Sequence, residues 1–188
     1  MASPSKSPAK RLLLADDARF DDHVPPHRGG YHPERPERLL AAREAAAIAA
    51  RPSEEGGLGV AWERVAIREA TDEELARVHD EKYVELFSKL AGKSGYLDPD
   101  TYLNEGSVRA AKSAAGALVE MIDRVRTADV SKGDASRGVA LVRPPGHHAR
   151  PSQAMGFCLV NNAAVAAAHA RARGMKKVAI VDFDVHHG

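Results

Sequence analysis

Two continuous apolar runs enclose the most informative part of the chain, GVALV at 138–142 and KVAIVDFDV at 177–185. The alanine-rich segment NNAAVAAAHARARG at 161–174 lies between them and has an asparagine near its start and a glycine at its end, which predicts a helix. Strands that are apolar throughout are typical of parallel sheets covered on both faces. We therefore predict a strand–helix–strand unit, with ligand sites beyond the carboxyl ends of its strands.

The upstream pattern predicts alternating strands and helices. We expect strands at about 11–15 (RLLLA) and at 62–69 (WERVAIRE), helices from near Pro36 through RLLAAREAAAIAA, at 71–92 (TDEELARVHDEKYVELFSKLAG) and at 108–125, and a long loop at 93–107. Residues 1–10 are predicted to form a disordered tail, because they combine Ser, Pro, Lys and Ala without an apolar run. Residues 11–188 then form part of one α/β domain.

Composition limits the classes of function. The 188 residues are 44% hydrophobic and carry 27 basic and 26 acidic side chains, which predicts no general attraction to nucleic acid or to an anionic membrane. The single cysteine, Cys158, excludes an intramolecular disulfide and a cysteine-rich zinc site. Since the sequence has no apolar run of membrane-spanning length and no signal-peptide pattern, we expect a cytoplasmic protein.

The second apolar run ends on Asp182, Asp184 and His186. In an extended strand these side chains point to the same face. A carboxylate and a neutral imidazole are common ligands of zinc-like ions, whereas two buried carboxylates without a cation would repel each other. The simpler alternative is an aspartate that caps a following helix. The spacing of three ionisable residues favours the metal site.

A second histidine pair, His147–His148, follows the first apolar run in RPPGHHA. The preceding prolines stiffen the turn and so fix the direction of the imidazoles, which could act as general base and electrostatic stabiliser near a metal. An isolated pair of this kind is usually part of a surface loop. Here a second histidine pair follows the other apolar run, which favours a joint site.

Several other histidines and the cysteine have side chains that could bind a metal or act in catalysis, but we predict structural roles for them. His169 lies within the alanine-rich helix, where a packing or a surface position is expected, and Cys158 is expected to be a packed neighbour rather than a nucleophile. The loop histidines His23, His27 and His32 suggest a second metal cluster, but hydrogen-bonded structural roles suit their loop better.

The segments LVRPPGHHARPSQAMGFCLVNNAAVAAAHA and KVAIVDFDVHHG together resemble the zinc-dependent histone deacetylases, especially the class II branch and the bacterial deacetylase-like and acetylpolyamine amidohydrolases. HPERPERL, VHDEKYV and DPDTYLNEGS are similar to upstream segments of that family. The resemblance implies an arginase-like three-layer fold with a mostly parallel central sheet, incomplete in this chain. It also implies hydrolysis of acetyl-lysine or an acetylpolyamine to the free amine and acetate.

The resemblance also implies roles for individual residues. Asp184 and His186 would be zinc ligands. His147 and His148 would be the catalytic pair, with His148 as general base and then acid, and Asp182 would orient His147. The backbone around these strand-end residues would line a structural potassium site.

Four further residues match positions that contact substrate or product in the family. Gly156 and Phe157 would line the substrate tunnel, Gly156 through its carbonyl and Phe157 as an apolar wall. Asp100 would hold the substrate backbone at the rim. Arg38 would lie in the internal channel under the site.

The chain departs from the family pattern in its site, because a third zinc ligand and an oxyanion-stabilising residue cannot be located in it. We therefore expect weak zinc binding, no deacetylase activity by this chain alone, and an exposed hydrophobic sheet edge at 177–185. Two alternatives are an arginase-like manganese ureohydrolase and a non-catalytic module that binds another chain through its sheet edge. The choice between protein and polyamine substrates, and the oligomeric state, stay open.

Overall fold

A computed structural model describes residues 10–26 and 31–188, and its centre is a three-stranded parallel sheet. The strand order is β2–β1–β5, with β1 at Lys10–Ala15, β2 at Val60–Arg64 and β5 at Gly138–Ala140. The predicted α/β class and the first strand are confirmed. β1 begins at the last residue of the expected tail, and residues 1–9 of that tail lie outside the described residues. The second strand begins two residues earlier than expected and ends five residues earlier.

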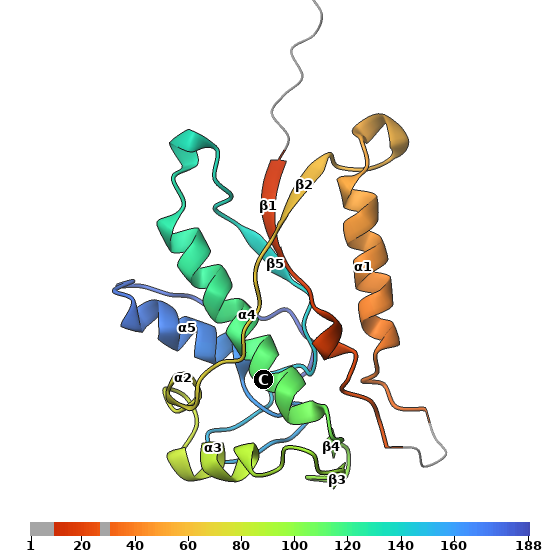
Figure 1. Cartoon of the computed structure of the whole chain (residues 1–188), viewed down its shortest axis with the longest axis vertical. Coiled ribbons are helices and arrows are strands. Elements are labelled where there is room, and N and C mark those ends of the chain that lie inside the picture. The colour runs from red at the N-terminus through yellow and green to blue at the C-terminus, as the bar shows by residue number, and fades with distance from the viewer. Residues whose placement is uncertain (1–9, 27–30) are drawn as a thin grey trace, which may run out of the picture.

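Helices lie on both sides of this sheet (Figure 1). α1 at Glu37–Ala50 packs beside β2, whereas α4 at Ser107–Thr127 packs against β1 and β5. α5 at Asn162–Ala172 lies along α4. Alanines make up much of the buried face of α4, and their small side chains allow close approach of the neighbouring elements. All three helices were expected from the sequence.

Short 3-10 turns complete the connections, η1 at Ala18–Phe20, η2 at Ser53–Glu55 and η3 at Val130–Lys132. Within residues 10–26 and 31–188, none of the helices combines the length and the apolar character needed to cross a bilayer.

The helix expected at 71–92 is two helices, α2 at Asp72–Leu75 and α3 at Glu81–Ser88. Its start is as predicted, because the Thr71 hydroxyl accepts from the Glu74 amide and the Glu74 carboxylate accepts from the Thr71 amide. The chain leaves the helix before His79, whose ring bonds to a distant loop. The apolar spacing continues across the break, so the sequence pattern did not reveal it.

The loop expected at 93–107 contains a small antiparallel hairpin, β3 at Gly95–Tyr96 and β4 at Tyr102–Leu103. The Asp98 carboxylate accepts hydrogen bonds from the amides of Asp100 and Thr101, at 3.0 and 2.6 Å. This is the local side-chain-to-backbone bonding that aspartate favours in turns. The hairpin therefore presents Asp100 at a defined place.

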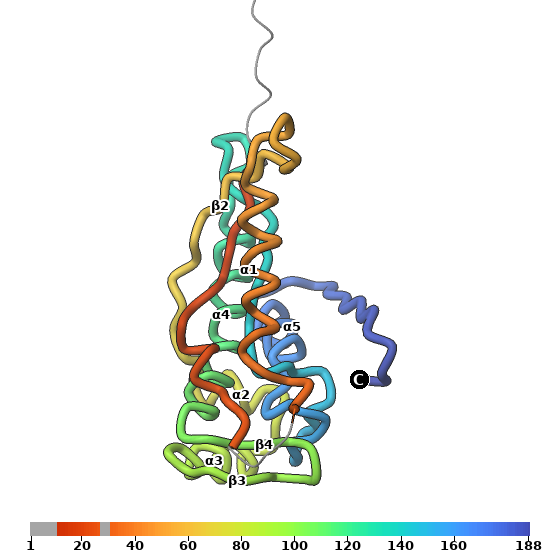
Figure 2. The backbone as a smooth tube through the Cα atoms, turned by 90° about the vertical axis from the view of Figure 1, so that its right-hand side faces the viewer, coloured from red at the N-terminus to blue at the C-terminus, as the bar shows by residue number. Residues whose placement is uncertain are grey.

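The strand expected at 177–185 is absent. This segment bends away from the rest of the molecule (Figure 2), and the side chains of Phe183 and Val185 are 97% and 91% exposed. In the described part of the chain no strand pairs with it. The carboxylates of Asp182 and Asp184 instead accept the backbone amides two residues onward, at 3.0 and 2.8 Å. These local bonds stabilise turns and not an extended strand.

A buried ion pair joins the loops at the carboxyl end of the sheet. Arg143, which follows β5, is 1% exposed, and its Nε donates to the fully buried carboxylate of Glu34. Its other nitrogens donate to the carbonyls of Phe20 and His23, at 3.0 and 2.8 Å, and to the Tyr102 hydroxyl at 3.1 Å. Each of the three guanidinium nitrogens therefore donates to a partner. A buried charged group needs such hydrogen bonds to offset its loss of water.

Replacing Glu34 with Ala should lower the free energy of unfolding by about 3–5 kcal/mol, because Arg143 would stay buried without its counter-charge. Urea denaturation measures this change. Glu37→Ala is the matched control, since Glu37 is exposed and lies 3.7 Å from Arg35, and it should change stability by less than about 1 kcal/mol. Equal effects of the two substitutions would contradict the structural role of the ion pair.

Gly116→Ala tests the close approach between α4 and residues 68–70. A Cβ at 116 would lie 2.1 Å from the carbonyl oxygen of Arg68, so we expect a loss of about 1–3 kcal/mol although alanine has the higher helix propensity. Thermal denaturation measures the loss. Arg109→Ala, on an exposed position of the same helix, should change stability by less than about 0.5 kcal/mol. A stabilising Gly116→Ala would show that α4 does not approach this segment so closely.

Candidate active site

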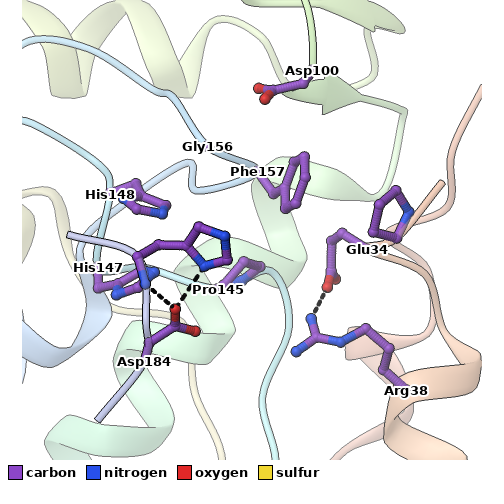
Figure 3. A pocket seen from close by; sticks show the side chains of 11 residues that line it. Glu34, Arg38, Asp100, Pro145, His147, His148, Gly156, Phe157 and Asp184 are labelled. Atoms are coloured by element: carbon purple, nitrogen blue, oxygen red, sulfur yellow. Dashed lines mark hydrogen bonds and ion pairs between the residues drawn. The ribbon is translucent and has the colours of Figure 1, made fainter. Parts of the chain in front are cut away.

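The residues selected from the sequence, apart from Asp182, converge on one pocket of about 410 Å³. Its lining is Pro33, Glu34, Arg38, Asp100, Pro145, His147, His148, Gly156, Phe157, Asp184 and His186. Figure 3 shows the histidine pair and Asp184 on one side, Glu34 and Arg38 on the other, and Asp100 above Phe157. These side chains come from five separate segments, so the fold and not the local sequence assembles the pocket.

The two adjacent histidines lie in the loop between β5 and α5. The ring centroids of His147 and His148 are 4.0 Å apart, and the His148 ring lies 6.2 Å from that of His186. His147 Nδ1 lies 2.9 Å from Asp182 Oδ2, which is the contact expected from the family resemblance. Asp182 does not line this pocket but two neighbouring hollows, which His147 also lines.

Asp184 and His186 reach the pocket from the bent segment. Asp184 Oδ1 lies 2.8 Å from both the backbone nitrogen and the ring Nδ1 of His186. The His186 amide and ring hold the pKa of the Asp184 carboxyl below its usual value, and the Asp184 amide and His147 do the same for Asp182. Both carboxyls are therefore ionised at neutral pH.

Asp184 and His186 have the oxygen and nitrogen donors that zinc prefers. Among the residues that the structure describes, no group of three or more histidine, cysteine or acidic side chains is placed to hold a metal. The donor chemistry therefore fits a zinc ion, but the set contains one ligand fewer than a three-ligand catalytic site.

The turn at 155–158 places Gly156 and Phe157 at the pocket. Met155 and Cys158 exchange backbone hydrogen bonds at 3.1 and 2.9 Å, and the two residues between them have positive φ, +55° for Gly156 and +68° for Phe157. A Cβ on Gly156 would lie 2.5 Å from the His148 ring. Glycine is therefore required for both the conformation and the close contact.

Thr101 supports both the rim and the wall of the pocket. Its hydroxyl accepts the Phe157 amide at 3.0 Å and lies 3.2 Å from the Asp100 carboxylate, to which it can donate. The Thr101 side chain is buried, whereas Asp100 is exposed at the rim. One hydroxyl thus joins two residues that the sequence analysis selected for substrate contact. Positive φ is unfavourable for phenylalanine, so this bond stabilises a strained residue.

Arg38 lies at the opposite side of the pocket, in the first turn of α1. Its side chain is 56% exposed and its Nη1 donates to Glu34. Glu34, Arg143 and Thr101 were not selected from the sequence, and nor was His79, whose ring bonds to the loop that carries Phe157. They lie inside the recognised segments HPERPERL, LVRPPGHHA, DPDTYLNEGS and VHDEKYV, which was the signal that could have identified them.

The other histidines and the cysteine have the structural surroundings that we expected. His23 is buried, with Nδ1 2.7 Å from the Ser107 hydroxyl, and His32 bonds to backbone groups of Glu34 and Asp100. His27 lies outside the described residues. Burial raises the pKa of the Cys158 thiol to about 12, so it is protonated at neutral pH and is no nucleophile there.

His169 is buried in a network of charged residues between helices. Its Nε2 lies 3.1 Å from Asp123 on α4, and its Nδ1 lies 2.9 Å from Arg77, after α2. The packing role that we expected is therefore a polar one, which joins α5 to two neighbouring segments.

Comparison with known proteins identifies close relatives. The histone deacetylase domain matches residues 32–188. Histone deacetylase 15 of Arabidopsis thaliana is 46% identical over 180 residues, which cover 95% of this chain and 29% of that protein. Polyamine deacetylase HDAC10 of Homo sapiens is 41% identical over 164 residues, 82% of this chain and 23% of that protein.

A solved structure gives the same result. The crystal structure of the HDA15 HD domain superposes with a TM-score of 0.78 at 40% identity, and the match covers 95% of this chain and 48% of that one. The chain thus spans under a third of the length of these two relatives and about half of the solved domain. The family match, the sequence identity and the shared fold together show that the chain belongs to the histone deacetylase family.

Proposed function

We propose that this chain supplies the catalytic histidines, two metal ligands and part of the substrate tunnel of a zinc-dependent deacetylase. The reaction would hydrolyse an acetylated amine to the free amine and acetate. The observation that carries the proposal is the pocket that His147, His148, Asp184, His186 and Phe157 line together.

Asp184 and His186 would hold the zinc ion, through a carboxylate oxygen and a ring nitrogen. When bound, zinc supplies Lewis acidity, which polarises a carbonyl group and makes water a better nucleophile at neutral pH. The ionised state of Asp184 suits this role, because a ligating carboxylate must be deprotonated. A structural potassium ion near the same backbone is part of the proposal, on the family resemblance alone.

The histidine pair would manage the protons. The His148 ring lies 6.2 Å from the His186 ring and against the pocket wall at Gly156, so His148 would take a proton from the attacking water and later deliver it to the leaving amine. His147, with Asp182 2.9 Å from its Nδ1, would stabilise developing negative charge while the carboxylate holds its ring orientation.

The tunnel residues favour a long alkyl amine as substrate. The methylenes of acetyl-lysine or of an acetylpolyamine would lose water against Phe157, and Asp100 at the rim would accept hydrogen bonds from polar groups outside the tunnel. Acetylation removes the charge of the amine, whose burial would otherwise be costly. The relatives are named for histone and for polyamine substrates, and both substrate classes remain within the proposal.

We predict that the 188-residue chain binds zinc with a dissociation constant of about 1 µM or weaker, because it offers two ligands, and that it does not turn over acetyl-lysine peptides or acetylpolyamines. Isothermal titration calorimetry and an acetate-release assay measure these properties. Asp184→Ala should abolish the zinc signal, whereas Asp100→Ala should leave it unchanged. Nanomolar affinity, robust turnover, or zinc binding that survives Asp184→Ala would each overturn this part of the proposal.

The Thr101 hydroxyl supports the rim of the proposed tunnel. Thr101→Val keeps the shape of the side chain but leaves the Phe157 amide without its acceptor, so the free energy of unfolding should fall by about 1–3 kcal/mol. The Phe157 amide signal in a ¹⁵N NMR spectrum should also shift. Thr101→Ser keeps the hydroxyl and should largely retain the wild-type shift. Identical spectra for the valine and serine variants would argue against the hydroxyl bridge.

A further inference from the structure

His79 bonds to both ends of the loop that carries Gly156 and Phe157. Its ring is 2% exposed and lies between α2 and α3. Nδ1 lies 3.0 Å from the Arg150 carbonyl oxygen, and Nε2 lies 2.9 Å from the Asn161 backbone nitrogen. A carbonyl can only accept and an amide N–H can only donate, so Nδ1 carries the proton and Nε2 is the acceptor. The two backbone partners therefore define one neutral tautomer.

Two neighbours of His79 hold the same loop. The Asp80 amide donates to the Pro151 carbonyl at 2.9 Å, and the Tyr83 hydroxyl donates to the Leu159 carbonyl at 2.5 Å. Together with His79 they form a clamp, residues 79, 80 and 83, on residues 150–161. The break between α2 and α3 makes this clamp possible, because a continuous helix would direct the Asp80 amide into its own backbone ladder.

The clamp continues to the proposed catalytic pair through Asn161. The Asn161 side-chain oxygen accepts the Ala164 amide at 3.0 Å and caps α5, while its Nδ2 donates to the His147 carbonyl at 3.4 Å. His79 thus reaches His147 in two hydrogen-bonded steps. It also sets the separation between the ends of the loop whose turn presents Phe157 to the pocket.

We propose that His79 is a positioning residue of the deacetylase site: its neutral ring, protonated at Nδ1, sets the distance between Arg150 and Asn161 and thereby the placement of Phe157 and His147. Its importance for catalysis rests on the proposed function. The bonds themselves belong to this chain and can be tested without turnover. The role needs a donor and an acceptor at opposite ends of one side chain, which explains why a buried histidine stands here rather than an apolar residue.

Protonation of His79 would remove the acceptor for the Asn161 amide. Burial lowers the pKa of the His79 imidazole below its usual value, against the raising effects of its backbone bonds and of the nearby Asp80 carboxylate. The Tyr83 ring also lies beside the His79 ring, at 5.3 Å between ring centroids, and burial raises the pKa of its hydroxyl. The Asn161 bond is therefore fully present above the usual histidine pKa of about 6.5, and is lost as pH falls through the lowered value.

Two substitutions separate the two bonds of the ring. His79→Gln places a side-chain oxygen near the Nε2 position and can still accept from Asn161, whereas His79→Asn places a side-chain nitrogen near the Nδ1 position and can still donate to Arg150. In the 188-residue chain we expect the Asn161 amide to exchange at least about tenfold faster in His79→Asn than in wild type, and to stay protected in His79→Gln. The Phe157 amide signal and the His147 carbonyl ¹³C signal should shift in His79→Asn.

The pH profile distinguishes positioning from simple packing. Wild-type protection of the Asn161 amide, corrected for intrinsic exchange, should fall as the pH is lowered through the depressed pKa of His79, whereas His79→Gln should show no such titration. Imidazole ¹⁵N shifts should report a proton on Nδ1 at pH 7. Protonation of Nε2 instead, or unchanged Phe157 and His147 signals in a folded His79→Asn chain, would overturn the proposal.

The zinc titration keeps this proposal separate from the proposed function. His79→Asn should bind zinc as wild type does, because Asp184 and His186 lie outside the clamped loop. A failure of the wild-type chain to bind any zinc would count against the metal site and leave the clamp intact. If His79→Asn changed the zinc affinity by more than about tenfold, the clamp would also affect Asp184 and His186, which would contradict its proposed action on residues 150–161 and His147.

Discussion

A buried guanidinium is the constraint on which this structure depends most. Arg143 is withdrawn from water, and an isolated buried charge is so unfavourable that each of its donors must be matched. The matching groups come from residues 20–34 and from Tyr102, more than forty positions away along the chain. Satisfying one side chain therefore brings two distant loops to the start of the loop that carries His147 and His148.

Glu34 makes this arrangement electrostatically tolerable. Its carboxylate contacts both the buried Arg143 and the half-exposed Arg38. It offsets the positive charge of Arg143 inside the protein, whereas the guanidinium of Arg38 is also partly solvated by water. Arg38 is thereby held at the pocket edge. The ion pair and the pocket share a residue, because Glu34 both pairs with Arg143 and lines the pocket beside Arg38.

Phe157, Asp100 and His147 are each held by a side chain that does not line the pocket. The Thr101 hydroxyl bonds to the amide of Phe157 and the carboxylate of Asp100, and the Asp182 carboxylate lies 2.9 Å from Nδ1 of His147. His79 provides the same kind of support from between two helices. Precise placement of reacting groups generally needs such a supporting layer. Many of these contacts are hydrogen bonds from a side chain to a backbone group far along the chain, and a sequence motif does not reveal such partners.

The sequence by itself determined the α/β class, most of the helices, and which side chains are candidates for catalysis, metal binding and substrate contact. Alanine-rich segments and apolar runs indicate which local segments are buried. The motifs around His147 and Asp184 indicate candidate catalytic and metal-binding side chains. The break between α2 and α3, the hairpin around Asp98 and the loss of the strand at 177–185 were decided by hydrogen bonds that periodicity does not encode. In the case of 177–185, an apolar run becomes a strand only when another strand satisfies its backbone, and no described strand does so. The tertiary structure alone decided the partners of Arg143, Thr101 and His79, because the groups that satisfy a buried polar side chain can lie anywhere along the chain.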